Sequence, residues 1–256
     1  MKAATHTWFM IGRQLRNLMR EPIWIVMMLI QPMIWLLLYG QLFSRVAALR
    51  GGAGSYVEFL APGVVVMNAF FGATWSGMAT IQDLDRSVID RFLATPASRL
   101  ALVLSQIVRS GLTAMIQALI ILGVGYALGV RVHGGVPGWL ATFAAAFLLA
   151  TAFAGISQGI ALLVRKDATM IAVANFIGLP LMFLSTILIS QNVMPRWMQS
   201  VANWNPVNWG AKAARDAIVL GGNWSGVLAH LGLLLAVTAA TAAFATWTLR
   251  VYARSI

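Results

Sequence analysis

The amino-acid sequence predicts an all-α integral membrane protein with six transmembrane helices, and three observations lead to this prediction. The 256 residues are 60% hydrophobic and only 10% charged, whereas soluble domains average about 45–50% and about 25%. Six apolar runs each reach the length of about 20 residues that a helix needs to cross the hydrocarbon core. Lys and Arg gather on alternate connecting segments, which is typical of a chain that threads a bilayer.

The six runs lie at 23–43, 59–81, 100–128, 136–164, 169–190 and 226–249. Open strands are excluded because their edge N–H and C=O groups would be unpaired in lipid. The alternating segments of about 10 residues that build a membrane barrel are absent from the sequence. No low-complexity linker or strong internal repeat is visible, so residues 1–256 form a single transmembrane domain.

The orientation follows from the positions of the 18 Lys and Arg residues. With the N-terminus inside the cell, eleven of them lie on inner segments, six on outer segments and Arg109 within a span. Because Lys and Arg favour the cytoplasmic side, both termini are expected there. The net charge of +11 is therefore attributed to membrane-flanking residues, and no nucleic-acid partner is expected.

The composition also restricts the chemistry. The chain has no Cys, which rules out disulfides and thiolate metal sites. No Asp or Glu lies within the six runs, which argues against a carboxylate proton relay. None of the lysines (Lys2, Lys166 and Lys212) follows a Gly, so the chain has no P-loop. Energy for uphill transport would have to come from another polypeptide, and no cofactor is expected in this chain.

A hypothesis of another class is an intramembrane hydrolase. Ser157, within Gly155–Gly159, and His230 are a conceivable nucleophile and base. A serine among small residues is, however, typical of helix–helix contacts in membranes.

Two segments on the predicted inner side are amphipathic. Residues 7–20 place apolar side chains on one helical face and Arg13 and Arg16 on another, which predicts an interfacial helix. Residues 83–97 predict a short helix that either lies on lipid or docks a soluble partner. Its apolar face comprises Val88, Ile89, Phe92 and Leu93, and its polar residues include Asp85, Arg86 and Arg91.

The longest connection, 191–225, lies outside in this topology and carries four of the ten tryptophans. Indole rings prefer the headgroup level, so the loop is expected to follow the outer interface. Asn205 can cap a helix that has Pro206 at its first position.

The order of several motifs resembles the permease subunits of type-2 ATP-binding-cassette exporters, most closely the daunorubicin-resistance type. The matching stretches are FLAPGVVVM at 59–67, DRFLATPASR at 90–99, LVRKD at 163–167, LPLMFLS at 179–185 and MPRW at 194–197, followed by Asn205, Pro206 and Arg215. The run at 82–85 departs from the resemblance, since a sequence richer in Arg and Glu is expected there.

The resemblance implies protein partners for the two amphipathic segments and for the membrane domain. Two P-loop ATPase subunits, which hold ATP and Mg, would dock on 83–97 as a coupling helix and on 7–20 as a connecting helix. The expected docking residues are Asp85, Arg86, Val88, Ile89, Arg91, Phe92, Leu93, Arg13 and Arg16. A second permease, identical or similar, would complete a dimer in the cell membrane.

The resemblance also suggests where cargo passes. The first, second and fifth spans would form the dimer interface, with Gln31, Trp35, Asn68, Phe70, Phe71, Met182 and Ser185 along the path. Short re-entrant helices in 191–225 would cover the outer end, with Pro195, Trp197, Asn205 and Pro206 at this gate. Aromatic and Met-containing walls suit a hydrophobic drug, antibiotic or lipid-like cargo. A lipid or polysaccharide exporter of the same architecture is the alternative.

Overall fold

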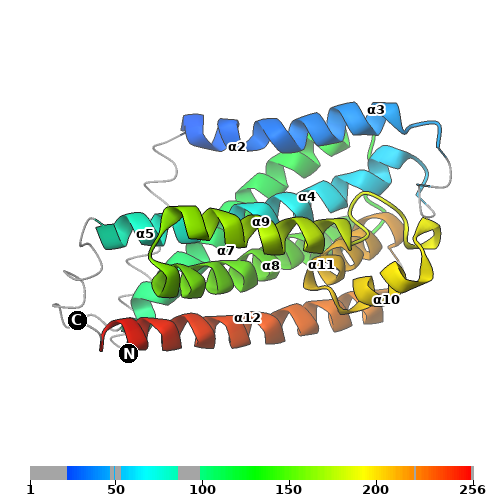
Figure 1. Cartoon of the computed structure of the whole chain (residues 1–256). Helices are drawn as coiled ribbons and strands as arrows, with labels where there is room; N and C mark the ends of the chain where they lie inside the picture. The colour runs from blue at the N-terminus through cyan, green and yellow to red at the C-terminus, as the bar shows by residue number, and fades with distance from the viewer. Residues whose placement is uncertain (1–21, 47–48, 50–52, 86–98, 222, 255–256) are drawn as a thin grey trace.

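The computed structural model describes residues 22–46, 49, 53–85, 99–221 and 223–254, and in these ranges all regular structure is helical (Figure 1). The α-helices are α2 (Pro22–Ile34), α3 (Gly40–Leu42), α4 (Tyr56–Thr74), α5 (Gly77–Asp85), α7 (Arg99–Ala127), α8 (Gly135–Val164), α9 (Asp167–Phe183), α10 (Arg196–Trp204), α11 (Pro206–Arg215) and α12 (Trp224–Tyr252). The π-helices η1 (Trp35–Tyr39) and η4 (Asp216–Leu220) and the 3₁₀-helix η3 (Gln191–Val193) complete the described elements.

Four helical stretches within the described residues are long and apolar enough to cross a membrane. They are Tyr56–Asp85, Val103–Ala127, Gly135–Val164 and Trp224–Tyr252. Two shorter apolar stretches, Leu29–Leu42 and Asp167–Phe183, lie where the first and fifth spans are predicted. The structure therefore confirms the all-helical fold for the residues it describes, with four helical stretches of membrane-spanning length, and the count of six spans stays a prediction.

Helix α8 lies at the centre of the bundle and packs against α4, α5, α7, α11 and α12 (Figure 1). Its small residues allow this close approach. A Cβ atom at Gly155 would lie 2.9 Å from the Thr241 hydroxyl oxygen, and one at Gly159 would lie 2.4 Å from the Phe244 ring. Because Gly155 and Gly159 have no side chains, Thr241 and Phe244 of α12 can pack closely against α8 at these positions.

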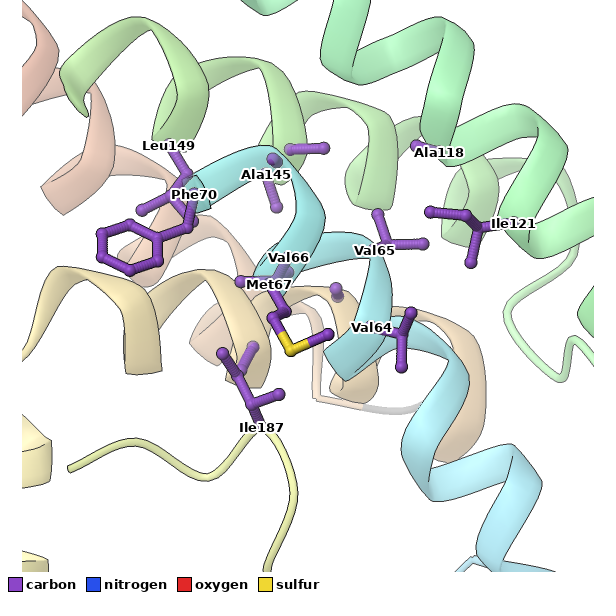
Figure 2. Close-up of a cluster of buried hydrophobic side chains, with 14 of the residues drawn as sticks. Val64, Val65, Val66, Met67, Phe70, Ala118, Ile121, Ala145, Leu149 and Ile187 are labelled. Carbon is purple, nitrogen blue, oxygen red and sulfur yellow. The ribbon is translucent and has the colours of Figure 1, made fainter. Parts of the chain in front are cut away.

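The main apolar core surrounds α4, most of which is buried. Figure 2 shows Val64, Val65, Val66, Met67 and Phe70 of this helix directed toward its neighbours. Those neighbours contribute Ala118 and Ile121 from α7, Ala145 and Leu149 from α8, and Ile187 from the segment after α9. The uniform burial of α4 explains why its sequence shows a continuous apolar run without an amphipathic pattern.

The predicted second span is interrupted between α4 and α5. Ser157 of α8 bridges the interruption, because its hydroxyl donates to the Thr74 carbonyl at 2.6 Å and accepts from the Gly77 N–H at 2.9 Å. Gly77 must be small here, since a Cβ would lie 2.6 Å from the Ser157 carbonyl oxygen. One serine thus satisfies a backbone acceptor and a backbone donor at a helix break.

The fifth predicted span also differs from expectation. Helix α9 ends at Phe183, whereas the apolar run continues to residue 190. Residues 184–190 form no helix or strand, and side chains of α11 and the residue before it hydrogen-bond to their backbone. Long-range polar contacts, which a hydropathy pattern does not reveal, therefore end this helix early.

Candidate functional site

Two short helices, α10 and α11, occupy the segment predicted as the outer loop, and Asn205 joins them. Its Oδ1 accepts from the Val207 N–H at 2.9 Å, with Pro206 at the first helical position, as expected from the sequence. Its Nδ2 also donates to the carbonyls of Leu181 and Leu184, at 2.6 and 2.9 Å. Asn205 therefore caps the start of α11 and the end of α9 with one side chain.

Asn208 holds the next part of the segment 184–190. Its Oδ1 accepts from the Thr186 N–H at 3.0 Å and from the Thr186 hydroxyl at 2.6 Å. Its Nδ2 donates to the carbonyl of Ala202 in α10 at 2.8 Å. Asn208 is fully buried, so these bonds connect α10, α11 and the segment 184–190 away from solvent.

Arg215 lies at the end of α11 and joins these elements to α4. Its Nη2 donates to the Thr186 carbonyl at 2.8 Å and to the Ile187 carbonyl at 3.4 Å, and its Nε donates to the Phe59 carbonyl at 3.2 Å. The guanidinium also lies 3.7 Å from the centre of the Phe59 ring. Gly63 makes room beside it, since a Cβ there would lie 2.5 Å from the Ile187 carbonyl oxygen.

The charge of Arg215 is enclosed, because only 7% of the residue is exposed. Burial lowers its pKa to about 10, an effect that the nearby Asp216 carboxylate opposes. The guanidinium is therefore still cationic at neutral pH. Burial also raises the pKa of Asp216, against the influence of His230 and Arg215. Carbonyl dipoles and the Phe59 ring supply the direct contacts of the buried cation.

A chain of aromatic rings leads from the first predicted span to this cation. Ring centroids are 4.3 Å apart for Trp35–Tyr39, 5.6 Å for Tyr39–Phe43, 5.8 Å for Phe43–Tyr56 and 6.1 Å for Tyr56–Phe59. The last three spacings lie within the range of about 4.5–7 Å that is typical of favourable aromatic pairs, and the first is slightly shorter. The first predicted span, the start of α4 and the buried guanidinium are thus in one continuous set of contacts.

The carboxylate of Glu58 is also buried at this end of α4. Its Oε2 accepts from the backbone N–H groups of Gly54 and Ser55, at 2.9 and 3.3 Å, and its Oε1 accepts from that of Arg131, at 3.1 Å. The Ser55 hydroxyl oxygen in turn accepts from the Glu58 N–H at the start of α4, which completes a capping box. The carboxylate therefore anchors the start of α4 to the loop before α8.

The predicted path residues differ in how far they are buried within this chain. Phe70, Met182 and Ser185 are buried inside this chain. Trp35 and Phe71 are partly buried, and Gln31 is exposed. Asn68 donates from its Nδ2 to the Gln117 side chain at 2.9 Å, so the polar faces of the second and third predicted spans meet. Whether any of these residues contacts cargo stays a prediction.

A large apolar groove of about 1070 Å³ lies between the α2–η1–α3 stretch and α7. Gln41 is the one polar side chain among its lining residues. The apolar walls include Ile30, Ile34, Leu37, Leu38, Ile120 and Val124. Because α2 packs only lightly on the rest of the bundle, this groove is open along one side.

The remaining predicted site residues that the structure describes lie next to α10 and at the end of α5. Pro195 precedes α10, and Trp197 in its first turn is exposed. Asp85 is the exposed last residue of α5. Eight predicted docking residues, which are Arg13, Arg16, Arg86, Val88, Ile89, Arg91, Phe92 and Leu93, lie outside the described residues. Their contact with an ATPase stays a prediction.

The geometry is incompatible with the hydrolase hypothesis. Helices α8 and α12 run side by side, and Thr151 contacts Thr238 at 3.4 Å. Ser157 and His230 lie in opposite directions from this contact, roughly 20 Å apart at 1.5 Å rise per residue. The Ser157 hydroxyl is also engaged with backbone groups at the helix break, so the two side chains form no catalytic pair.

The sequence resemblance drew attention to Arg215 but assigned it no role, and Asn208 and Thr186 were not singled out. The chemical signal was present, because an Arg and two Asn residues that become buried need hydrogen-bond partners. Their partners in the segment 184–190 and in α4 lie 21 to 156 residues away along the chain, beyond the reach of local patterns.

Comparison with known proteins identifies the class of molecule. Residues 5–219 match the family described as ABC-2 type transporter. A putative transport permease, ycf38 of Cyanophora paradoxa, is 30% identical over 202 residues, which cover 78% of this chain and 69% of that protein. The daunorubicin resistance ABC transporter permease protein DrrB1 of Streptomyces coeruleorubidus is 25% identical over 97% of this chain and 84% of its own.

A third relative, the probable doxorubicin resistance ABC transporter permease protein DrrC of Mycobacterium tuberculosis, is 22% identical over 84% of this chain and 77% of its own. These relatives are transport permeases, which supports a non-enzymatic membrane subunit and agrees with the resemblance in the motifs at 59–67 and 90–99. With its several apolar helices, and with the family match extending from residue 5 to residue 219, the chain belongs to the ABC-2 type transporter family of multi-pass membrane permeases.

Proposed function

We propose that this chain is the permease subunit of an ATP-driven exporter that moves a hydrophobic or amphipathic compound, such as a drug, an antibiotic or a lipid-like molecule, out of the cell. The observation that carries the proposal is the family match over residues 5–219, which includes the helices of the bundle from α2 to α9 and the α10–α11 region. Two of the relatives are named for daunorubicin or doxorubicin resistance.

The energy would come from two copies of a separate ATPase, which hold ATP and Mg, because the chain has no P-loop. The ATPase would dock on residues 83–97 and 7–20. The first three residues of the segment 83–97 are the last three of α5, which ends at Asp85. A second permease, identical or similar, would complete the transporter.

In the proposed topology, α2–η1–α3 and α9 are the two spans that join the four longer stretches, and both termini are cytoplasmic. Helices α10 and α11 would be re-entrant elements at the outer surface. The absence of Cys makes this topology testable by single-cysteine labelling in the otherwise native chain. Trp204→Cys, at a residue 83% exposed, should react with an impermeant maleimide in intact cells. Lys166→Cys and Arg254→Cys should react only after permeabilisation, and the reverse pattern would overturn the topology.

The contacts described above suggest how motion could pass through the subunit. A pull on α5 would act on α4 across the break that Ser157 bridges. At its far end α4 contacts Arg215, which holds the segment 184–190 and α11. Opening of the outer end would therefore require a movement of α4 that either carries Arg215 with it or breaks the hydrogen bond between Arg215 and the Phe59 carbonyl.

The walls of the large groove support an apolar cargo over a sugar polymer. Its lining is aliphatic apart from Gln41 and carries no ring on which a sugar could stack. Such a surface binds apolar molecules through burial and excludes those that need many hydrogen bonds. A lipid exporter of the same architecture shares this chemistry.

The proposal is tested with the permease and its ATPase reconstituted together in proteoliposomes. Apolar compounds should stimulate ATP hydrolysis and move across the bilayer only when both proteins are present. An ATPase variant with the P-loop lysine replaced serves as the control. Full transport by the permease alone, or no stimulation by any apolar compound while a polysaccharide is moved, would overturn it.

A further inference from the structure

A smaller groove of about 300 Å³ lies between α7 and α12, near the C-terminal end of α12. The two helices pack directly beside it through apolar residues that include Val103, Ala245 and Leu249. The groove is therefore an indentation in a packed pair of helices. Its lining residues are Leu104 from α7 and Ala242, Ala243, Thr246, Trp247 and Arg250 from α12.

The groove changes character along its length. From Ala242 to Arg250 it extends about 12 Å along the helix, at 1.5 Å per residue. Its inner part is bounded by Leu104, Ala242 and Ala243, and Thr246 uses its hydroxyl to donate to the Ala242 carbonyl at 2.8 Å. Trp247 and Arg250 stand at the other end and are exposed. An apolar slot thus leads to an indole ring and then to a cation.

Arg250 is available to an external anion. Within the part of the chain that the structure describes, it has no hydrogen-bond or ion-pair partner. Arg165, at the same end of the bundle, instead lies 4.5 Å from the centre of the Tyr252 ring. The exposed guanidinium of Arg250 sits in the last turn of a membrane helix, where a phosphate oxygen is the usual counter-ion.

We propose that this groove binds one anionic glycerophospholipid, with its phosphate at Arg250, its glycerol level at Trp247 and an acyl chain against Leu104, Ala242 and Ala243. Tryptophan favours the headgroup level, and basic sites between membrane helices bind anionic headgroups. Only the leaflet depends on the proposed function: with a cytoplasmic C-terminus the lipid belongs to the inner leaflet. Lipid binding and export can therefore fail separately.

The test uses native mass spectrometry of the full-length permease in detergent, titrated with palmitoyl-oleoyl phosphatidylglycerol or with the matching phosphatidylcholine. The wild-type chain should retain phosphatidylglycerol preferentially. Arg250→Gln should lower that preference about fivefold, the contribution of one basic residue near a membrane surface. Arg254→Gln is the matched control, because Arg254 is exposed at the same end but does not line the groove.

A second pair of variants tests the shape of the groove independently of charge. Ala243→Phe fills it and should reduce retention of both lipids, whereas Ala236→Phe adds the same bulk at an exposed position of α12 outside the groove. If Arg250→Gln does not fold, the comparison of Ala243→Phe with Ala236→Phe tests the proposal by itself. Equal effects of Arg250→Gln and Arg254→Gln, equal effects of the two Phe variants, or equal retention of the two lipids by the wild-type chain would overturn the proposal.

Discussion

Arg215 offers the sharpest test of how α4, α11 and the segment 184–190 of this permease are held together. Replacing it with Ala removes hydrogen bonds to the Thr186 carbonyl at 2.8 Å and the Phe59 carbonyl at 3.2 Å, together with the contact to the Phe59 ring. Hydrogen bonds to charged groups contribute about 1.5–3 kcal/mol each, and a desolvated cation–π contact contributes about 2 kcal/mol. Desolvation of the guanidinium opposes these terms by several kcal/mol.

The variant also leaves buried carbonyls without donors. Thr186 and Ile187 lie in a segment with no helix or strand, and each unsatisfied carbonyl costs about 1–3 kcal/mol. We expect Arg215→Ala to lower the free energy of unfolding by about 3 kcal/mol. For a protein of this size, that corresponds to a fall in Tm of roughly 6–12 °C.

The measurement is thermal denaturation of the purified permease in detergent, followed by loss of its monodisperse size-exclusion peak. Arg215→Lys should recover part of the loss, because an ammonium can donate to one carbonyl but does not reproduce the planar fork. Arg196→Ala, at an exposed residue of the neighbouring helix α10, should change stability by less than about 0.5 kcal/mol. If Arg215→Ala and Arg196→Ala shift Tm equally, Arg215 does not hold the segment 184–190.

Three further predictions concern other parts of the chain. Arg91→Glu or Phe92→Asp should abolish transport while the permease still inserts in the membrane; undiminished efflux in both would refute the docking role of 83–97. Ser157→Ala should lower stability by about 1–2 kcal/mol, since two backbone groups lose a partner, yet retain transport in proteoliposomes, whereas selective loss of activity with unchanged stability would contradict a purely structural role. Gly63→Ala should cost about 1–3 kcal/mol through overpacking, whereas Gly72→Ala, with nothing within 4 Å of its Cβ, should be neutral or stabilising in the same melting experiment.

The sequence by itself determined the class of this protein. Its apolar runs are long enough to cross a bilayer, and in lipid a chain without a closed barrel satisfies its backbone groups only as helices. The absence of a Gly-Lys pair excluded a P-loop, and the motifs at 59–67 and 90–99 indicated the family that residues 5–219 match. The Asn205–Pro206 pair predicted a helix start because both capping residues act within one turn.

The tertiary structure decided what the polar side chains do. Hydropathy continues to residue 190, yet α9 ends at Phe183 because Asn208 and Arg215 hydrogen-bond to the backbone that follows it. Ser157 likewise proved to bridge a helix break, a role set by the approach of α8 to α4. Hydrophobic periodicity acts over a few neighbouring residues, whereas the partner of a buried polar group is chosen by which helices pack together, and that choice is made only when the bundle assembles.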